Sequence, residues 1–255
     1  MARKNKKNKD NLKHVAVTVL YLSIFCFIVG ISFWWSGLKE KTTIELKFSE
    51  TNILETKTYE SLVSEIMQDS SIQDKTSEIR KKIEEHPYVK AVRVSNHYPS
   101  QIKIEIIERE PIAIVNKDPM VLLDKSGFVL PDLGNLNKHI LPVMSNFNSD
   151  EDFYPNGKKA LSVKIIECIS LLSQLKEQYG ELYDNLSEIK MSASNEIELI
   201  LADQPTHIFL GNHDIDSRIN ILKEFEKELK PKSISGYSYL DIRYDNQVIA
   251  KRRHS

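Results

Sequence analysis

The stretch from residue 86 to residue 113 reads HPYVKAVRVSNHYPSQIKIEIIEREPIA, and its apolar pattern decides how the surrounding chain folds. In its second half, isoleucine alternates with polar residues over residues 102–106, which is typical of a strand with one buried face. Its first half is rich in valine over residues 89–94, and His97-Tyr98-Pro99-Ser100 between the halves has the composition of a turn. The stretch therefore predicts a β-hairpin that ends before Pro111.

The segment before this hairpin supplies one strand and two helices. Residues 44–48 (IELKF) alternate between apolar and polar and predict a strand. Apolar residues at helical spacing predict a helix over residues 58–67 and a second one over 73–86, which Pro87 ends. Residues 42–110 therefore have the order β-α-α-β-β.

The segment after Pro111 is larger and mixes strands with helices. Short apolar runs predict strands over residues 112–115, 121–124, 128–131, 187–192, 196–202 and 206–210. Helices are predicted over 158–178 and 215–230, a loop over 131–157, and extended segments over 239–244 and 248–250 around a turn at Asp245-Asn246. We expect an α+β protein in which residues 111–253 form a mixed α/β domain with a mainly antiparallel sheet.

Residues 15–37 form an uncharged apolar run that is long enough to cross a membrane as a helix. Before this run, residues 1–14 carry six basic side chains and one acidic one, a net charge of +5. Because positive charge keeps that end of a membrane helix in the cytoplasm, we expect a cytoplasmic head, an uncleaved signal-anchor helix and an extracytoplasmic remainder. The alternatives are a cleaved signal peptide, which has a shorter apolar region, and a nucleic-acid-binding arm, which needs a folded reader beside it.

The hexapeptide FLGNHD at residues 209–214 contains Gly-Asn-His-Asp, which metallophosphoesterases place at a two-metal centre. Such a centre needs several further ligands, but the sequence contains neither Asp-x-His nor Gly-Asp-x-x-Asp. We interpret Gly211 as a turn residue, and Asn212, Asp214 or Asp216 as the cap of the following helix.

Other catalytic patterns are also missing from the sequence. Cys26 lies in the apolar run and Cys168 lies far outside it, so they cannot form an internal disulfide, and Cys168 is interpreted as a small core residue. There is no zinc-type Cys-His cluster, no Gly-x-Ser-x-Gly elbow and no Gly-rich phosphate loop. We expect no enzymatic activity, catalytic residue, metal, cofactor, small-molecule substrate or nucleic-acid partner.

Seven short motifs occur one after another along the chain. The motifs are Pro87-Tyr88-Val89, Tyr98-Pro99, Glu108-Arg109-Glu110-Pro111-Ile112-Ala113, Leu123-Asp124-Lys125-Ser126-Gly127, Leu141-Pro142-Val143, Phe209-Leu210-Gly211 and Tyr239-Leu240-Asp241-Ile242-Arg243-Tyr244. This set, placed behind a membrane anchor, resembles the FtsQ/DivIB family of bacterial cell-division proteins. The resemblance implies that residues 42–110 are a POTRA domain and that residues 111–253 are the C-terminal β domain of the family.

The resemblance also implies a function. It implies a non-enzymatic scaffold of the divisome, which lies in the inner (cytoplasmic) membrane at the division septum and helps to control septal peptidoglycan synthesis. The strand after Asp245-Asn246 would pair with a segment of an FtsB-like protein, in a complex that also holds an FtsL-like protein. At the corresponding positions of this sequence, the resemblance implies these partner-binding candidates: Tyr244, Asn246, Val248, Ile249, Ala250 and Lys251.

Two alternatives accompany these expectations. An edge strand can simply complete its sheet, so the candidate residues have a purely structural interpretation as well. A POTRA-type chaperone or docking module for exported polypeptides, without a role in division, is the alternative function, because POTRA modules also keep an open sheet edge.

Overall fold

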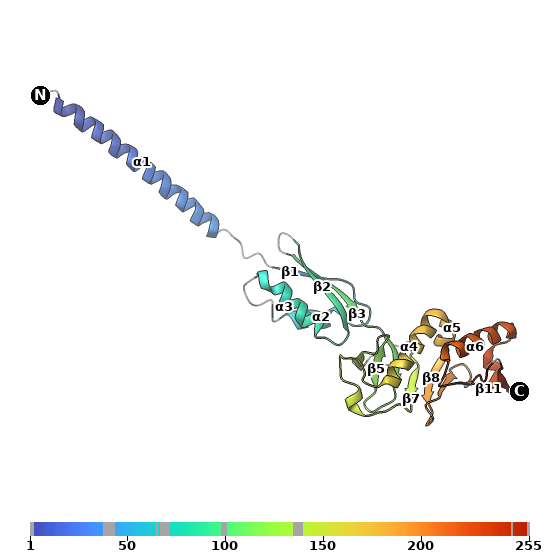
Figure 1. Cartoon of the computed structure of the whole chain (residues 1–255). Coiled ribbons are helices and arrows are strands. Elements are labelled where there is room, and N and C mark those ends of the chain that lie inside the picture. The colour runs from blue at the N-terminus through green and yellow to red at the C-terminus, as the bar shows by residue number, and fades with distance from the viewer. Residues whose placement is uncertain are drawn as a thin grey trace. The chain divides into compact units, whose positions relative to one another are not determined.

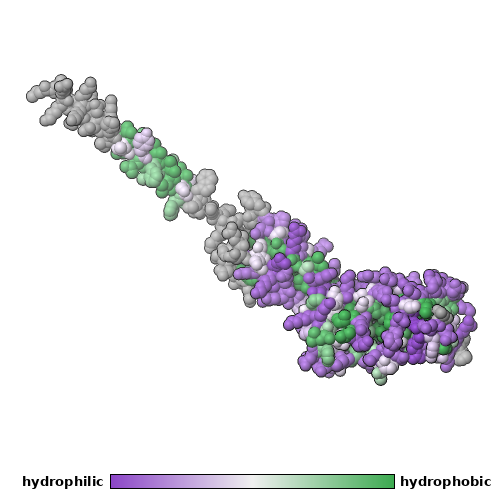
Figure 2. All heavy atoms as spheres, in the orientation of Figure 1, coloured by the Kyte–Doolittle hydropathy of each residue, from purple (hydrophilic) through white to green (hydrophobic). Residues whose placement is uncertain are grey.

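The computed structural model describes residues 3–37, 44–64, 66, 72–97, 101–134, 140–245 and 247–253 of the 255-residue chain (Figure 1). Its first element is the helix α1 (Arg3–Gly37), which contains the stretch Val17–Trp34. This stretch has a mean hydropathy of 2.2 and is long and apolar enough to cross a membrane, and Figure 2 shows it as a hydrophobic band. The helix also includes the basic segment from Arg3, because no glycine or proline interrupts it there.

A β-α-α-β-β module follows, in the order that the sequence predicts. It consists of β1 (Glu45–Phe48), α2 (Thr56–Val63), α3 (Ile72–Glu84), β2 (Val89–His97) and β3 (Gln101–Glu108). Among the described residues its strands form a three-stranded sheet in the order β1-β3-β2, so that β1 and β2 are the edges. The isoleucines that alternate along β3 are buried, as are Tyr59 and Val63 on α2 and Ile79 and Ile83 on α3. The alternation that predicted the hairpin therefore buries one face of β3.

A larger, sheet-rich domain contains the remaining elements. Its strands are β4 (Pro111–Val115), β5 (Val121–Asp124), β6 (Val129–Pro131), β7 (Val143–Ser145), β8 (Leu186–Met191), β9 (Ile197–Leu201), β10 (His207–Gly211), β11 (Tyr237–Asp241) and β12 (Ile249–Arg252). Its helices are α4 (Val163–Gln178), α5 (Gly180–Asp184) and α6 (Ile215–Leu229), with short 3-10 turns η3 (Glu151–Phe153) and η4 (Ile234–Gly236). In the described part of the chain, these strands form one sheet in the order β12-β11-β10-β9-β8-β7-β4-β5-β6.

Most neighbouring strands of this sheet are antiparallel. The pairs β4-β5, β5-β6, β8-β9, β9-β10 and β11-β12 are antiparallel, whereas β4-β7, β7-β8 and β10-β11 are parallel. The predicted fold class is confirmed: a candidate membrane helix, a β-α-α-β-β module and a larger mixed domain with a mainly antiparallel sheet.

The pleat of this sheet gives it two different faces. One row of paired residues consists of Ala250, Leu240, Ile208, Leu199, Ile189 and Met144, from β12 to β7. From Leu240 onward this row is buried in the core that α4, α5 and α6 cover (Figure 1). The next row consists of Lys251, Tyr239, His207, Ile200 and Glu188, and it lies on the opposite face because successive side chains of a strand alternate.

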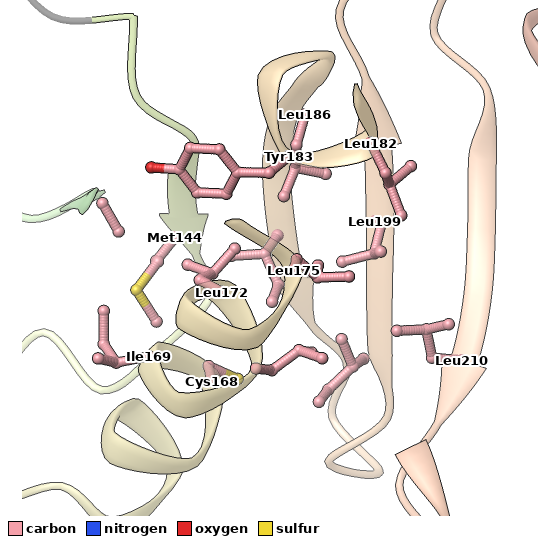
Figure 3. Close-up of a cluster of buried hydrophobic side chains, with 14 of the residues drawn as sticks. Met144, Cys168, Ile169, Leu172, Leu175, Leu182, Tyr183, Leu186, Leu199 and Leu210 are labelled. Atoms are coloured by element: carbon pink, nitrogen blue, oxygen red, sulfur yellow. The ribbon is translucent and has the colours of Figure 1, made fainter. Parts of the chain in front are cut away.

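The core of the domain lies between the sheet and its helices. Figure 3 shows Cys168, Leu172 and Leu175 of α4 and Leu182 of α5 packed with Met144, Leu199 and Leu210 of the strands. All of these side chains are buried, and the three on α4 share one helix face because they are three or four residues apart. Each fully buried leucine contributes about 1.5–3 kcal/mol of hydrophobic free energy, so this layer holds the helices on the sheet.

Several elements differ from the sequence predictions. The predicted loop over residues 131–157 contains β7, a buried strand of three residues whose parallel partners β4 and β8 are distant in sequence, so no local pattern marks it. The helix predicted from residue 158 begins at Val163, because the Ser162 hydroxyl caps it by accepting the Ile165 N–H. The short helix α5 was not predicted.

The segment around Gly211 confirms one interpretation and corrects another. Gly211 has φ +83°, in the left-handed region that glycine adopts readily, so its interpretation as a turn residue is confirmed. Asp214 occupies the N-cap position of α6, but its φ is +51° and its side chain makes no capping hydrogen bond. The Asn212 side chain instead donates to the Ser194 carbonyl at 3.4 Å, so the predicted side-chain cap is wrong for both residues. The third candidate, Asp216, lies inside the first turn of α6, after the N-cap position.

Candidate partner-binding edge of the sheet

The strand β12 lies at one edge of the larger sheet and pairs only with β11 in the described part of the chain. Tyr239 pairs with Lys251, Leu240 with Ala250 and Asp241 with Ile249. All four residues of β12 are exposed. An edge strand of this kind offers backbone groups to a further strand.

The direction of the backbone groups on β12 follows from two hydrogen bonds. The Lys251 carbonyl accepts a hydrogen bond from the Ser238 hydroxyl at 3.1 Å, and the Arg253 N–H donates to the Gly236 carbonyl at 3.1 Å. Residues 251 and 253 therefore direct their backbone groups toward β11. Because these directions alternate along a strand, the N–H and C=O groups of Ala250 and Arg252 point away from the sheet.

The side chains of β12 divide between the two faces of the sheet. Ala250 shares the helix-covered face with its partner Leu240, whereas Ile249 and Lys251 lie on the opposite face with Asp241 and Tyr239. Ile249 is 43% exposed, so its side chain is available to a neighbouring strand. A strand added to β12 would meet an apolar residue and a basic residue on this outer face.

The turn before β12 is fixed by two ion pairs. Arg218 of α6 is buried, and its guanidinium donates to the Asp245 carboxylate at 2.7 Å. The Arg243 guanidinium binds both carboxylate oxygens of Asp241, with Nε to Oδ1 at 2.9 Å and Nη2 to Oδ2 at 2.7 Å. These hydrogen bonds lower the pKa of the Asp241 carboxyl group and raise that of Arg243. The strand β11 ends at Asp241, earlier than the extended segment predicted over residues 239–244.

The structure brings most of the predicted partner-binding residues to one place. Ile249, Ala250 and Lys251 lie on β12, and Val248, which precedes the strand, packs partly against the core. Tyr244 lies earlier, in the turn, and is 45% exposed. Asn246 lies outside the described residues.

Sequence reasoning did not identify the residues that support this edge. Arg218 follows Ile215 by three residues and precedes Leu222 by four, so it lies on the apolar face of α6. A charged residue on an apolar helix face indicates a buried ion pair, and this signal was present in the sequence. The groove that α6 forms with Gln247 and Val248, lined on the helix by Ile221 and Phe225, had no such signal.

The Glu108-Arg109-Glu110 motif has a structural role. The Glu108 carboxylate accepts hydrogen bonds from the N–H groups of Asn52, Ile53 and Leu54, at 2.7, 2.8 and 3.0 Å, and from the Tyr59 hydroxyl at 2.8 Å. Arg109 binds the buried Asp124 at 2.8 Å and lies 3.6 Å from the centre of the Phe128 ring. The motif therefore fixes the start of α2 to β3, and β3 to the β5–β6 hairpin.

The described residues offer little for catalysis. They contain no group of three or more His, Cys, Asp or Glu side chains that could hold a metal ion. Cys168 is fully buried, and burial raises the pKa of its thiol to about 12, so it is not a thiolate at neutral pH. The surface that remains as a candidate site is the edge of the sheet.

Comparison with known proteins identifies the family. The model "FtsQ/DivIB, C-terminal related" matches residues 110–251, which is more than half of the chain, and "POTRA domain, FtsQ-type" matches residues 52–109. The chain belongs to the FtsQ/DivIB family. The family resemblance of the sequence motifs is thereby confirmed, and neither of these matching models describes an enzyme.

Individual relatives carry the same family name. The chain is 26% identical over 176 residues to the cell division protein FtsQ of Geotalea daltonii, and 27% identical over 179 and 170 residues to those of Koribacter versatilis and Syntrophotalea carbinolica. These matches cover 67–68% of the chain and 62%, 49% and 59% of the relatives. The matched part thus spans about half to three fifths of each relative. Membership of this family supports a role in cell division.

Proposed function

We propose that the chain is a non-enzymatic, membrane-anchored scaffold of the division machinery that binds an FtsB-like protein by strand addition. The observation that carries this proposal is the free edge of β12, where Ala250 and Arg252 direct their backbone groups away from the sheet. A partner strand would pair with these groups and gain its register from them, while its alternate side chains would supply specificity. Tyr244, Asn246, Val248, Ile249, Ala250 and Lys251 form the proposed contact segment.

The anchor and its orientation complete the proposal. Residues 15–37 would cross the inner (cytoplasmic) membrane once, with the basic residues 1–14 in the cytoplasm. The proposed POTRA domain, residues 42–110, and the proposed C-terminal β domain, residues 111–253, would lie outside the cytoplasm. At the septum the scaffold would join FtsB-like and FtsL-like partners and help to control septal peptidoglycan synthesis.

A second candidate function is a POTRA-type docking module for exported polypeptides. The observation in its favour is that β2 (Val89–His97), a strand of nine residues, lies at an edge of its own sheet. The two candidates differ in where the protein collects. A fluorescent fusion that forms a band at midcell supports the division scaffold, whereas a uniform envelope signal supports the docking module.

The strand-addition site is tested by Ala250→Pro. The Ala250 N–H points away from β11, so proline removes a hydrogen bond to a partner without removing one to the sheet. The matched control is Ala193→Pro, in the exposed turn closed by the hydrogen bond from the Asn195 N–H to the Ser192 carbonyl, where proline is tolerated. We expect the full chain with Ala250→Pro to lose co-purification of FtsB-like and FtsL-like proteins and the Ala193→Pro chain to retain it. Unchanged co-purification by a folded Ala250→Pro protein would rule out this site.

A further inference from the structure

A wide cleft lies between the second half of α6 and the junction of α4 with α5. Its volume is about 940 Å³, and the described residues that line it include four lysines and two glutamates. These are Lys223, Lys227, Lys230, Lys232, Glu181 and Glu226, and we call this surface the lysine cleft. Its net charge is +2, whereas the chain after residue 14 has a net charge of −6. A positive surface on a negatively charged protein attracts anionic ligands to that place.

The two lysines in the middle of α6 have partners, but these partners leave much of their charge available. The Lys223 ammonium group donates to the Gln178 carbonyl at 3.0 Å and lies 5.2 Å from the centre of the Tyr179 ring. Because a carbonyl carries no net charge, the positive charge of Lys223 is not neutralised there. Lys227 pairs with Glu224 at 2.5 Å, and exposed ion pairs of this kind are weak.

The two lysines at the end of the cleft are freer. Lys230 and Lys232 are exposed, and neither forms an ion pair with any residue in the described ranges. Cations near the C-terminus of a helix stabilise that helix, but Lys232 lies beyond the end of α6, so this effect does not account for it. Even if each glutamate of the cleft offsets one lysine, two lysine charges remain for a ligand.

The arrangement of the lysines indicates what kind of anion fits. Lys223, Lys227 and Lys230 follow one flank of α6, and the rise of a helix places them roughly 6 and 4.5 Å apart along its axis. Alternate side chains of an extended peptide are about 6.6–6.8 Å apart, and the flexible lysine side chain can bridge this difference. Tyr179 and Pro231 add apolar surface to the cleft. The cleft therefore suits an extended peptide with acidic residues at alternate positions and an apolar residue between them.

A second copy of this chain fits less well than a different protein. The acidic run Asp150-Glu151-Asp152 of this chain is held in the turn η3, where the Asp150 carboxylate accepts the Asp152 N–H at 3.3 Å, so it is not extended. Two copies, each with a net charge of −6 after residue 14, also repel each other.

We propose that the lysine cleft is a second docking site, which binds an extended acidic segment of another protein. The cleft lies on a different flank of α6 from the groove beside Val248, so a partner on β12 leaves it open. This inference goes beyond the proposed function, since it does not require that a strand adds to β12.

Synthetic peptides test the inference on the full chain in nanodiscs of neutral lipid. The probe is the tetramethylrhodamine-labelled peptide Thr-Glu-Leu-Glu-Thr-Glu-Thr, and fluorescence polarisation compares it with a version that has glutamine in place of each glutamate. At low salt we expect the glutamate peptide to bind about tenfold more tightly, as three exposed ion pairs imply. This preference should disappear at about 1 M salt, where charges are screened within about 3 Å. A version with serine in place of leucine should bind about threefold more weakly, because less apolar surface is buried.

Two double variants of the chain locate the effect. Lys230→Gln combined with Lys232→Gln removes two exposed cations without ion pairs, and should reduce the preference for the glutamate peptide to about twofold. The matched control is Lys158→Gln combined with Lys159→Gln, which removes two exposed lysines away from the cleft and should leave the preference unchanged. Far-ultraviolet circular dichroism confirms that both are folded. The cleft variant should still co-purify an FtsB-like protein, because its substitutions are not on the flank of α6 beside β12.

Each contrary outcome overturns a specific part of the inference. Equal binding of the glutamate and glutamine peptides at low salt, or no binding at millimolar peptide, overturns the docking site. An equal loss of preference in the two double variants assigns the effect to net charge and overturns the cleft.

Further outcomes concern the occupant. Tripolyphosphate that binds the cleft more tightly than the peptide, with no preference for leucine over serine, overturns the choice of a peptide in favour of a phosphate compound. Dimers of the chain that the cleft variant dissociates, detected by analytical ultracentrifugation, overturn it in favour of a second copy. Loss of the FtsB-like protein from the folded cleft variant overturns the claim that this site is separate from β12.

Discussion

The buried guanidinium of Arg218 on α6 donates a hydrogen bond to the carboxylate of Asp245, 2.7 Å away in the turn that leads to β12. The Arg218 side chain is 9% exposed and that of Asp245 is 88% exposed, so a buried cation depends on a partner at the surface. The Nε atom of Arg218 is buried and has no hydrogen-bond partner. The turn that starts the edge strand is thus tied to the helix that lines the groove.

The first prediction concerns this pair. Asp245→Ala leaves the Arg218 guanidinium buried without its carboxylate and should lower the free energy of unfolding by about 1–3 kcal/mol, near the lower value because Asp245 is exposed. In an Arg218→Met background, which removes the buried charge, Asp245→Ala should have no effect. Urea unfolding of the full chain in detergent, followed by far-ultraviolet circular dichroism, measures both. An equal loss in the two backgrounds would show that the pair is not coupled.

A control for this prediction lies in the turn between β9 and β10. Asp203 is an exposed aspartate there, so Asp203→Ala removes a similar carboxylate away from Arg218. Its free energy of unfolding should stay within about 0.5 kcal/mol of the unsubstituted chain.

The second prediction compares two glutamates of one motif. Glu108→Ala leaves three backbone N–H groups and the Tyr59 hydroxyl without their acceptor, and should cost about 3 kcal/mol or more of stability. Glu110→Ala breaks an ion pair with Lys176 whose carboxylate side chain is 67% exposed, and should cost less than about 1 kcal/mol. The same urea experiment measures both. If the two substitutions cost the same, the backbone contacts of Glu108 are not what makes it important.

Local patterns were sufficient to predict much of the fold. The alternating isoleucines of β3 and the helical spacing on α6 each reflect contact with a single buried layer, so the period of the apolar residues reveals the element. The edge strand could also be predicted from the sequence, since Ile249 and Ala250 follow a clear turn and precede a basic tail. The sequence prediction failed for β7, whose three residues form a strand only because β4 and β8 flank them.

The candidate site was harder to predict from the sequence than the fold. Pairing partners across the sheet determine which backbone groups of β12 are free, and no feature of residues 248–252 alone distinguishes Ala250 from Lys251 in this respect. The groove depends on how α6 packs beside Val248, which combines two segments that are separated in the sequence. Such features require the tertiary structure because they arise from contacts between distant parts of the chain.

The third prediction is a pH dependence that Asp241 creates. Hydrogen bonds from Arg243 hold the pKa of the Asp241 carboxyl group below its ordinary value of 3.8 in the folded state. The ionised form therefore stabilises the fold above that value, and the contribution is lost as the pH falls through the lowered pKa. The stability difference between the unsubstituted chain and Asp241→Asn should be constant near neutral pH and shrink below about pH 4. Urea unfolding at a series of pH values measures it, and a difference that stays constant down to about pH 2 contradicts the prediction.

The fourth prediction tests the turn at Gly211, where φ is +83°. Gly211→Val forces a β-branched side chain into the left-handed region, at a cost of about 1–2 kcal/mol, and its Cβ would lie 3.3 Å from Cγ of Arg243. Gly180→Ala is the matched control, because a Cβ there meets nothing within 4 Å and its φ is not in that region. His213→Ala, at an exposed position two residues further on, should leave stability and cell division unchanged.

The contact with Arg243 gives Gly211→Val a second expected effect. Arg243 holds the carboxylate of Asp241, which pairs with Ile249 of β12, so a displaced Arg243 loosens the strand that supports the edge. Gly211→Val should therefore weaken co-purification of the FtsB-like partner at temperatures where the variant is still folded by circular dichroism. Gly211→Ala should cause a similar loss of stability from backbone strain but a smaller loss of partner, because alanine has no methyl groups beyond Cβ to displace Arg243. Equal loss of partner in both variants would mean that backbone strain alone, and not the contact with Arg243, transmits the effect.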